Sequence, residues 1–143
     1  MKKLLTLALV AVLAITLAAC GGSGAIKDGT YTAEYKNMSH DWKEYLSVTY
    51  KDGKITDVDF DAKNADGKLK SSCTPEEYPM DPPVSEWLPQ LEANIKAAGA
   101  ADKVEAVAGA TGSSNSAKEL MAAVEKQAKA GKTEVAVVEN PAA

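Results

Sequence analysis

The most informative stretch for the fold is Glu44–Phe60, which reads EYLSVTYKDGKITDVDF. β-Branched and aromatic residues alternate with polar ones over 44–50 and again over 55–60, which is typical of half-buried strands. Asp52 and Gly53 lie between the two segments and favour a type I′ turn, because both residues readily take the positive φ that this turn requires. We therefore expect a β-hairpin at the centre of a sheet.

The alternation also assigns the two faces of this hairpin. In the first strand one face carries Leu46, Val48 and Tyr50, and the other carries Tyr45, Ser47 and Thr49. In the second strand Val58 and Phe60 are expected on the buried side. The exposed side would then carry three acids, Asp57, Asp59 and Asp61. Three carboxylates could hold a metal ion, although a solvated sheet face explains them more simply.

Outside the hairpin, the chain predicts one more strand on the N-terminal side and a long loop on the C-terminal side. Thr30–Tyr35 has the composition of a strand and follows a turn signal at Asp28-Gly29. Residues 62–83 show little periodicity and contain four of the six prolines. Loops of this length in small domains often serve as lids or binding loops.

Two amphipathic helices and two short strands are expected in the second half. The first helix has Pro89 in its first turn, ends at Gly99, and carries on one face Trp87, Leu88, Leu91, Ile95 and Ala98. The second ends at Gly131 and carries on one face Ala117, Leu120, Met121, Val124 and Ala128. The strands are expected at 104–107 and 133–139, followed by a frayed tail at 140–143. The predicted fold is α+β: a single domain with an antiparallel sheet and two helices packed on one face.

The first twenty residues have the pattern of a secretory signal. Lys2 and Lys3 precede an apolar run, and Leu17–Gly21 reads LAACG, which resembles the lipobox of bacterial lipoproteins. The resemblance implies a signal peptide at 1–19, acylation of Cys20 (with palmitate among the acyl groups) and a flexible tether at 20–27. The folded domain would then span 28–139. A retained membrane anchor is the alternative, but the apolar run is short for a spanning helix.

Composition excludes several classes of function. The 143 residues include 16 lysines, no arginine and 20 acids, for a net charge of −4; cleavage after residue 19 removes two lysines and leaves 14 − 20 = −6. A surplus of acids argues against binding nucleic acid. His40 is the only histidine, which leaves little for a zinc site or a hydrolase triad. Cys73 would be the one cysteine left unacylated, too few for a disulfide framework.

Residues 107–116 read VAGATGSSNS and lead into the second helix. Gly109 and Gly112 permit close approach of the backbone to a ligand, and a helix N-terminus attracts phosphate through its free N–H groups and its dipole. No Gly-Lys-Ser/Thr ending marks a P-loop. The alternative is a capping function, in which Ser114, Asn115 or Ser116 caps the helix and the glycines only make a turn.

The same segment resembles the Ser-Gly-Ala-Thr motif of the FMN-binding domain family, which includes the C subunit of the sodium-pumping NADH:quinone reductase and flavin-carrying lipoproteins. Asp28–Tyr31 is similar to the Asp-Gly-x-Tyr that opens this domain, and Asp52–Val58 to its central hairpin. In covalent members a flavin transferase joins the FMN phosphate to the motif's threonine. The resemblance implies a cofactor site at Gly109, Ala110, Thr111, Gly112, Ser113 and Ser114.

Two positions depart from the family pattern and leave the mode of attachment open. Ala108 stands where the motif has serine, and Glu105 stands where the acid before it is usually aspartate. FMN could therefore be covalent at Thr111 or held noncovalently. The isoalloxazine ring needs apolar or aromatic walls. Candidates for them are Tyr31, Trp42, Tyr45, Tyr78 and Trp87, with His40 as a further contact.

The implied function is a lipid-anchored FMN protein of the extracytoplasmic membrane face that relays electrons to a redox partner. Such a protein is an electron carrier rather than an enzyme with its own substrate, and no catalytic residue or metal ligand is predicted. The alternative is a lipoprotein of the same fold that binds another ligand or a partner without flavin. A peptide pheromone ending in Ile15–Ala19 could also be released from the signal segment.

Overall fold

The hairpin expected from the sequence lies at the centre of the fold. In the computed structural model, which describes residues 25–141, β2 (Lys43–Lys51) and β3 (Lys54–Lys63) pair antiparallel. Asp52 and Gly53 join them with φ of 52° and 74°. Positive φ at both central positions confirms the type I′ turn.

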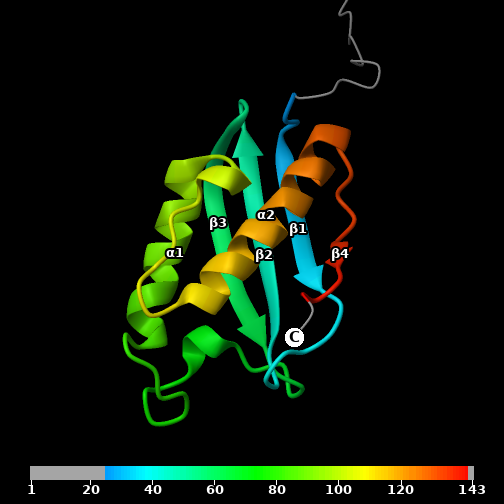
Figure 1. The fold of residues 1–143 in the computed structure, drawn as a ribbon. Coiled ribbons are helices and arrows are strands. Elements are labelled where there is room, and N and C mark those ends of the chain that lie inside the picture. Colours follow the sequence, from blue (N-terminus) through cyan, green and yellow to red (C-terminus); the bar gives the residue numbers. More distant parts are fainter. Residues whose placement is uncertain (1–24, 142–143) are drawn as a thin grey trace, which may run out of the picture.

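The sheet has four strands in the order β3-β2-β1-β4 (Figure 1). β1 (Gly29–Tyr35) pairs antiparallel with β2, whereas β4 (Ala136–Val138) pairs parallel with β1. The prediction of a wholly antiparallel sheet was therefore wrong, and the sheet is mixed. The second helix carries the chain back to the end of the sheet where β1 begins, so the returning strand runs in the same direction as β1.

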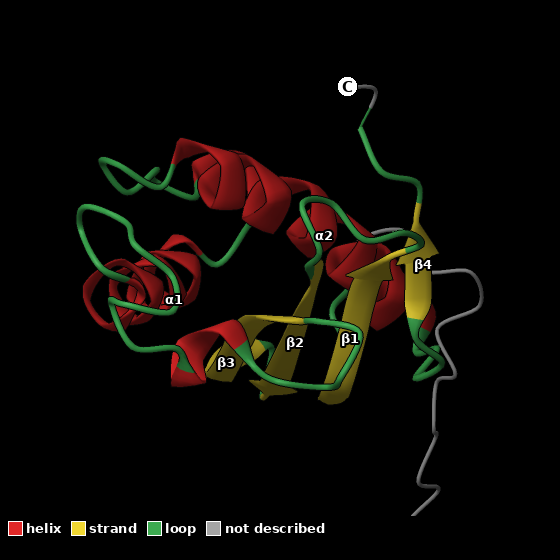
Figure 2. Ribbon diagram, turned by 90° about the horizontal axis from the view of Figure 1, so that it is seen from below, coloured by secondary structure: helices red, strands yellow, loops and turns green. Residues whose placement is uncertain are grey.

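Two helices cover one face of the sheet, as predicted (Figure 2). They are α1 (Val84–Ala98) and α2 (Thr111–Ala130), which end at Gly99 and Gly131 in left-handed conformation. The core between helices and sheet includes the large, fully buried side chains Trp87, Tyr31, Phe60, Leu46, Leu91, Ile95, Leu120 and Met121. The α+β class and the single domain are thus confirmed.

Both helices begin earlier than the sequence indicated. Because α1 starts at Val84, Pro89 lies in its second turn and not in the first. Because α2 starts at Thr111, the polar residues expected ahead of the helix form its first turns. Neither helix has a side-chain cap at its N-cap residue, Pro83 or Ala110.

The segments around the helices correct three further predictions. Residues 104–107 form no strand: a 3-10 turn, η2 (Ala101–Lys103), precedes them, and Val104 and Val107 are buried in the core without a strand to pair with. The last strand spans 136–138 only. Asn140 is not frayed, because its amide side chain exchanges two hydrogen bonds with the backbone of Asn37, at 2.8 and 2.9 Å.

Asp61 is buried, although the alternation of β3 placed it on the exposed face. The loop after β3 folds back over this position and forms a 3-10 turn, η1 (Lys70–Ser72). One carboxylate oxygen of Asp61 accepts hydrogen bonds from the backbone N–H groups of Ala62 and Ser71, at 2.7 and 3.1 Å. Asp57 and Asp59 are exposed, as predicted.

Among residues 25–141, no helix is long and apolar enough to cross a membrane. The predicted signal peptide at 1–19, Cys20 and most of the tether lie outside the described residues, so these remain predictions.

Candidate functional site

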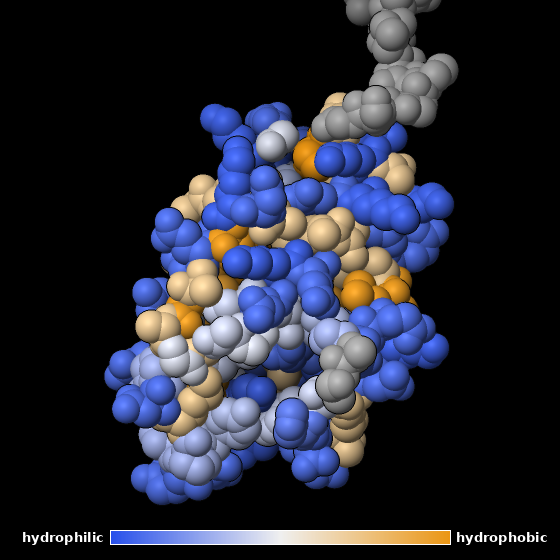
Figure 3. Space-filling view, viewed as in Figure 1, coloured by the Kyte–Doolittle hydropathy of each residue, from blue (hydrophilic) through white to orange (hydrophobic). Residues whose placement is uncertain are grey.

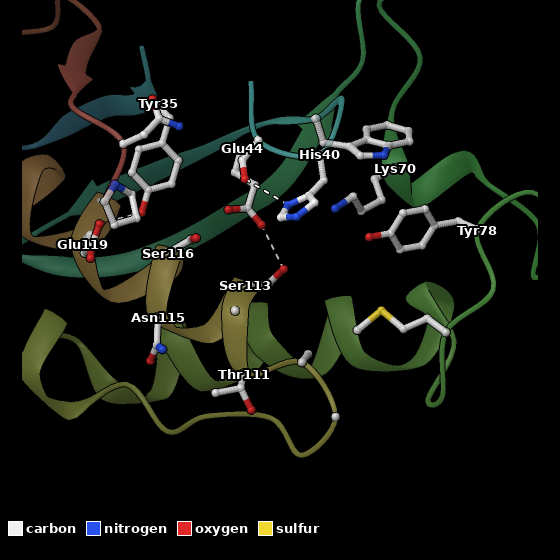
Figure 4. Close-up of a pocket in the computed structure, with 18 residues that line it drawn as sticks. Tyr35, His40, Glu44, Lys70, Tyr78, Thr111, Ser113, Asn115, Ser116 and Glu119 are labelled. Atoms are coloured by element: carbon white, nitrogen blue, oxygen red, sulfur yellow. Dashed lines mark hydrogen bonds between the residues drawn. The ribbon is translucent and has the colours of Figure 1, made fainter. Parts of the chain in front are cut away.

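A cavity of about 640 Å³ opens beside the N-terminus of α2, where Figure 3 shows a hollow in the helix-bearing surface. Its volume is within the range of small-molecule sites. Its walls come from α2, the start of β2, the loop before it, and the long loop around η1 (Figure 4). The lining residues include Tyr35, His40, Trp42, Glu44, Lys70, Tyr78, Met80, Gly109, Ala110, Thr111, Gly112, Ser113, Asn115, Ser116 and Glu119.

Gly109 is required by the turn that leads into α2. Its φ is +83°, and a Cβ at this position would clash with Cδ of Pro82 and lie 2.8 Å from the carbonyl oxygen of Asp81. The turn closes with a hydrogen bond of 3.0 Å from the Ala110 N–H to the Val107 carbonyl. Close packing against the long loop therefore sets the point at which α2 begins.

The N-terminus of α2 presents unpaired donors to the cavity. Thr111, Gly112 and Ser113 occupy the first three helical positions, whose N–H groups have no acceptor within a helix. No described side chain caps them, and the first turn contains no acid. Thr111 and Gly112 are exposed. The helix dipole and these donors together favour an anion such as phosphate.

Of the six residues predicted to bind the cofactor between 109 and 114, Ser114 alone does not line the cavity. Its side chain is 0 % exposed. The hydroxyl accepts a hydrogen bond from the Val107 N–H at 3.0 Å and donates one to the Ala110 carbonyl at 2.8 Å. Ser114 therefore links the Val107–Ala110 turn to the start of α2. The alternative that Ser114 caps the helix was wrong in its detail, but Ser114 does have a structural function.

Two carboxylates also line the cavity. Glu44 accepts a hydrogen bond of 2.9 Å from the hydroxyl of Ser113, so one carboxylate lies beside the helix N-terminus. Glu119 accepts one of 2.7 Å from the hydroxyl of Tyr35. Burial, reinforced by the charge of Glu119, raises the pKa of the Tyr35 hydroxyl well above its ordinary value. Tyr35 is therefore a neutral donor at physiological pH.

The opposite part of the cavity is aromatic. Trp42 and Tyr78 meet edge to face, with ring centroids 5.9 Å apart, and Lys70 lies against both rings. Of the aromatic candidates, these two alone line the cavity. Tyr31 and Trp87 are core residues, and Tyr45 lies on the uncovered face of the sheet against Lys63. His40 lines the cavity, with its Nδ1 3.1 Å from the Ser39 hydroxyl.

Sequence reasoning missed several residues that line this cavity, among them Tyr35, Glu44, Lys70 and Glu119. Their positions depend on contacts between segments far apart in the chain, and no local spacing marks them. Within residues 25–141, no three His, Cys, Asp or Glu side chains come together in a group that could hold a metal ion.

This fold and site define a small α+β domain with an uncapped helix N-terminus on one side of a cavity and an aromatic wall across the cavity from it. The sequence profile described as the FMN-binding domain matches residues 42–126, which include the hairpin, all of α1, the 107–116 segment and most of α2. The chain belongs to the FMN-binding domain family.

Two individual proteins are similar over most of the chain. The 15 kDa lipoprotein of Treponema pallidum (strain Nichols) is 31% identical over 131 residues, which cover 87% of this chain and 92% of that protein. A crystal structure of a Clostridium perfringens protein superimposes with a TM-score of 0.75 at 33% identity. That match covers 81% of this chain and 99% of the other.

Proposed function

We propose that this protein is a membrane-anchored lipoprotein that binds FMN and relays electrons outside the cytoplasmic membrane. The observation that carries the proposal is the uncapped N-terminus of α2, which opens into a cavity inside the matched FMN-binding domain. Bound FMN supplies the capacity to accept and pass on one or two electrons, which no side chain of this cavity offers.

The phosphate of FMN fits the N-terminal turn of α2. The N–H groups of Gly112 and Ser113 point toward the start of the helix and lack partners in the fold. Gly109 brings the turn so close to Pro82 that no side chain can intervene. The exposed hydroxyl of Thr111, at the first helical position, is where a phosphoester would form if a flavin transferase acts on this chain.

The flavin ring fits the aromatic part of the cavity. Trp42 and Tyr78 would supply its walls, together with the partly buried Met80. A flavin ring is flat and largely apolar. Its binding site therefore requires a wall that excludes water on at least one side of the ring. The hydroxyl of Tyr35, which is neutral and donates to Glu119, belongs to the polar part of the same cavity.

Membrane attachment through Cys20 completes the proposal. The lipobox-like Leu17–Gly21 and the similarity to a protein named as a lipoprotein support it. A short tether keeps a carrier at high effective concentration near partners in the same membrane. Cys20→Ser should release the protein from the membrane fraction, which fractionation and immunoblotting would detect.

Mass and colour of the purified full-length lipoprotein test flavin binding. Co-expressed with a flavin transferase, it should be yellow and heavier by one FMN minus water. Thr111→Ala should remove the covalent adduct, because it removes the exposed hydroxyl to which the phosphate would be joined. Thr133→Ala is the matched control, since Thr133 is exposed and distant from the cavity-lining segment.

The outcomes separate the alternatives. A yellow protein of unmodified mass supports noncovalent FMN, a mode that the departures at Ala108 and Glu105 leave open beside the covalent one. A colourless protein that also fails to bind added FMN contradicts the proposal and leaves a lipoprotein that binds another ligand or partner. The signal-derived pheromone remains a separate prediction, tested by peptide mass spectrometry of the culture medium.

A further inference from the structure

Lys70 is a largely buried residue whose ammonium group has no acidic partner. The residue is 7% exposed, and it forms no ion pair with any of the residues from 25 to 141. Its Nζ lies 5.2 Å from the ring centroid of Trp42 and 4.8 Å from that of Tyr78. The ammonium group therefore sits against two aromatic rings at the wall of the cavity, as Figure 4 shows.

The backbone around Lys70 is firmly placed. The next residue, Ser71, donates its N–H to the buried carboxylate of Asp61 at 3.1 Å. Cys73 donates its N–H to the Lys70 carbonyl at 3.0 Å, which closes η1. Because Asp61 belongs to β3, this connection fixes the position of Lys70 relative to the sheet. The backbone that carries Lys70 is thus held in place by the fold.

An ammonium group that is partly removed from water gains from a nearby negative charge or polar partner. Contacts with two aromatic rings supply only part of that gain. The carboxylates of the cavity are engaged elsewhere: Glu44 accepts from Ser113, and Glu119 from Tyr35. The cation consequently favours a negative charge that arrives with the ligand.

We propose that Lys70 contacts the flavin ring and raises the reduction potential of bound FMN by stabilising the reduced form. The inference rests on the proposed function, because it assigns a residue to the site described there. Uptake of two electrons and one proton leaves the ring with one additional negative charge. A neighbouring cation stabilises that charge and leaves the uncharged oxidised ring nearly unaffected.

The phosphate is the less suitable partner for Lys70. The unpaired N–H groups of α2 already provide a phosphate site, and they belong to a different wall of the cavity from the aromatic pair. The two assignments also differ in their consequences. The phosphate is anionic whether the ring is oxidised or reduced, so a cation that bound it would strengthen FMN binding without changing the potential.

The experiment is a reductive titration of the full-length FMN-loaded lipoprotein, with dithionite supplying the electrons and being oxidised to sulfite. Lys70→Gln should weaken binding of reduced relative to oxidised FMN by on the order of tenfold, because an opposite charge at about 4–6 Å shifts an equilibrium by that much or more. Tenfold corresponds to a potential about 30 mV lower for a two-electron couple. Lys70→Arg keeps the charge and should restore most of the difference.

Lys63→Gln is the matched control. Lys63 also lies over an aromatic ring, at 5.0 Å from the centroid of Tyr45, but it is exposed and does not line the cavity. Its removal changes the net charge as much as Lys70→Gln does and should leave the potential unchanged. Circular dichroism and thermal melting of each variant without flavin establish that the fold is retained.

Riboflavin has the flavin ring but lacks the phosphate. Its binding to protein made without the flavin transferase therefore distinguishes contact of Lys70 with the ring from contact with the phosphate. An equal potential for wild type and Lys70→Gln overturns the inference. So does a loss of affinity by Lys70→Gln for oxidised FMN that riboflavin does not share, because Lys70 would then bind phosphate. A wild-type protein that binds no flavin contradicts the proposed function itself, which distinguishes that failure from the failure of this inference.

Discussion

Glu92, on α1, shows how a single carboxylate can be useful to a fold and still destabilise it. Its side chain accepts a hydrogen bond from the Phe60 N–H at 2.9 Å and thereby satisfies a donor at the edge of β3. Burial raises its pKa above the ordinary value, and the nearby charges of Asp59, Asp61 and Asp57 act in the same direction. The folded protein therefore binds a proton at Glu92 more tightly than the unfolded chain does.

The sign of the resulting pH dependence follows from linkage. Below the ordinary pKa of glutamate, Glu92 is protonated in both states and contributes no pH dependence. As pH rises through the raised pKa, the folded state must ionise a half-buried carboxyl, and the free energy of unfolding falls. Glu92→Gln keeps the acceptor and removes the charge. We expect it to stabilise the protein at pH 7 by no more than about 1 kcal/mol, since solvent screens the site.

Urea denaturation at pH 7 and at pH 4 tests this prediction. The stabilisation by Glu92→Gln should be present at pH 7 and diminish at pH 4. Glu134→Gln is the control, because Glu134 is exposed and its carboxylate makes no hydrogen bond or ion pair within residues 25–141. A stabilisation of equal size at both pH values would mean that the charge of Glu92 is not its cause.

At the scale of residues, local chemistry predicts some positions and long-range contacts determine the others. Gly99, Gly131 and the Asp52-Gly53 pair were predicted because the backbone conformation that each adopts is a property of the residue itself. The function of Ser114 depends on the Val107 N–H, which reaches it only once the turn has formed. Lys70 lies in an aperiodic loop, where no sequence signal distinguishes it from other lysines.

At the scale of elements, the turn at Gly109 is the feature on which the start of α2 depends. Gly109→Ala should cost about 1–3 kcal/mol of the free energy of unfolding, because it forces a side chain into a positive φ and into contact with Pro82. It should also weaken FMN binding, since the turn has to shift. The two measurements are urea denaturation and titration with FMN.

Gly112→Ala provides the matched comparison three residues further on. Gly112 lies inside α2, its φ is not positive, and no atom lies within 4 Å of a Cβ built there. Alanine is the better helix former, so this variant should be as stable as wild type or more stable by up to about 1 kcal/mol. Equal destabilisation by the two substitutions would contradict the role assigned to the turn.

Element types were largely predictable, whereas their boundaries and pairings were not. Alternation and helical spacing identified the hairpin and both helices, because these patterns record which side faces the core. The alternation of 104–107 resembled a strand, but no neighbouring strand is available to pair with it. The parallel pairing of β4 with β1 depends on where α2 returns the chain, which is not a local property.

At the scale of the whole molecule, the first described residues and the cavity lie at opposite ends of α2. The N–H of Lys27 bonds to the Ala128 carbonyl at 3.1 Å, beside the C-terminus of the helix. A 20-residue helix is about 30 Å long. On the proposed attachment through Cys20, the tether would join the domain far from the cavity and leave its opening accessible to redox partners.

Net charge gives a prediction that belongs to the molecule as a whole. From Cys20 onward the chain has 14 lysines and 20 acids, a balance of −6, and such a field repels anions and attracts cations. Reoxidation of the reduced FMN protein by ferricyanide should therefore accelerate as salt is added, whereas reoxidation by hexaamminecobalt(III) should slow down. The change should be steepest below about 0.1 M ionic strength, where the Debye length exceeds about 10 Å.

Stopped-flow absorbance of the flavin measures both rates, and a neutral quinone, which should show little salt dependence, is the control. Reversed signs, with ferricyanide slowed and hexaamminecobalt(III) accelerated by salt, would mean that positive local charge at the cavity mouth, and not the net charge, governs electron exchange.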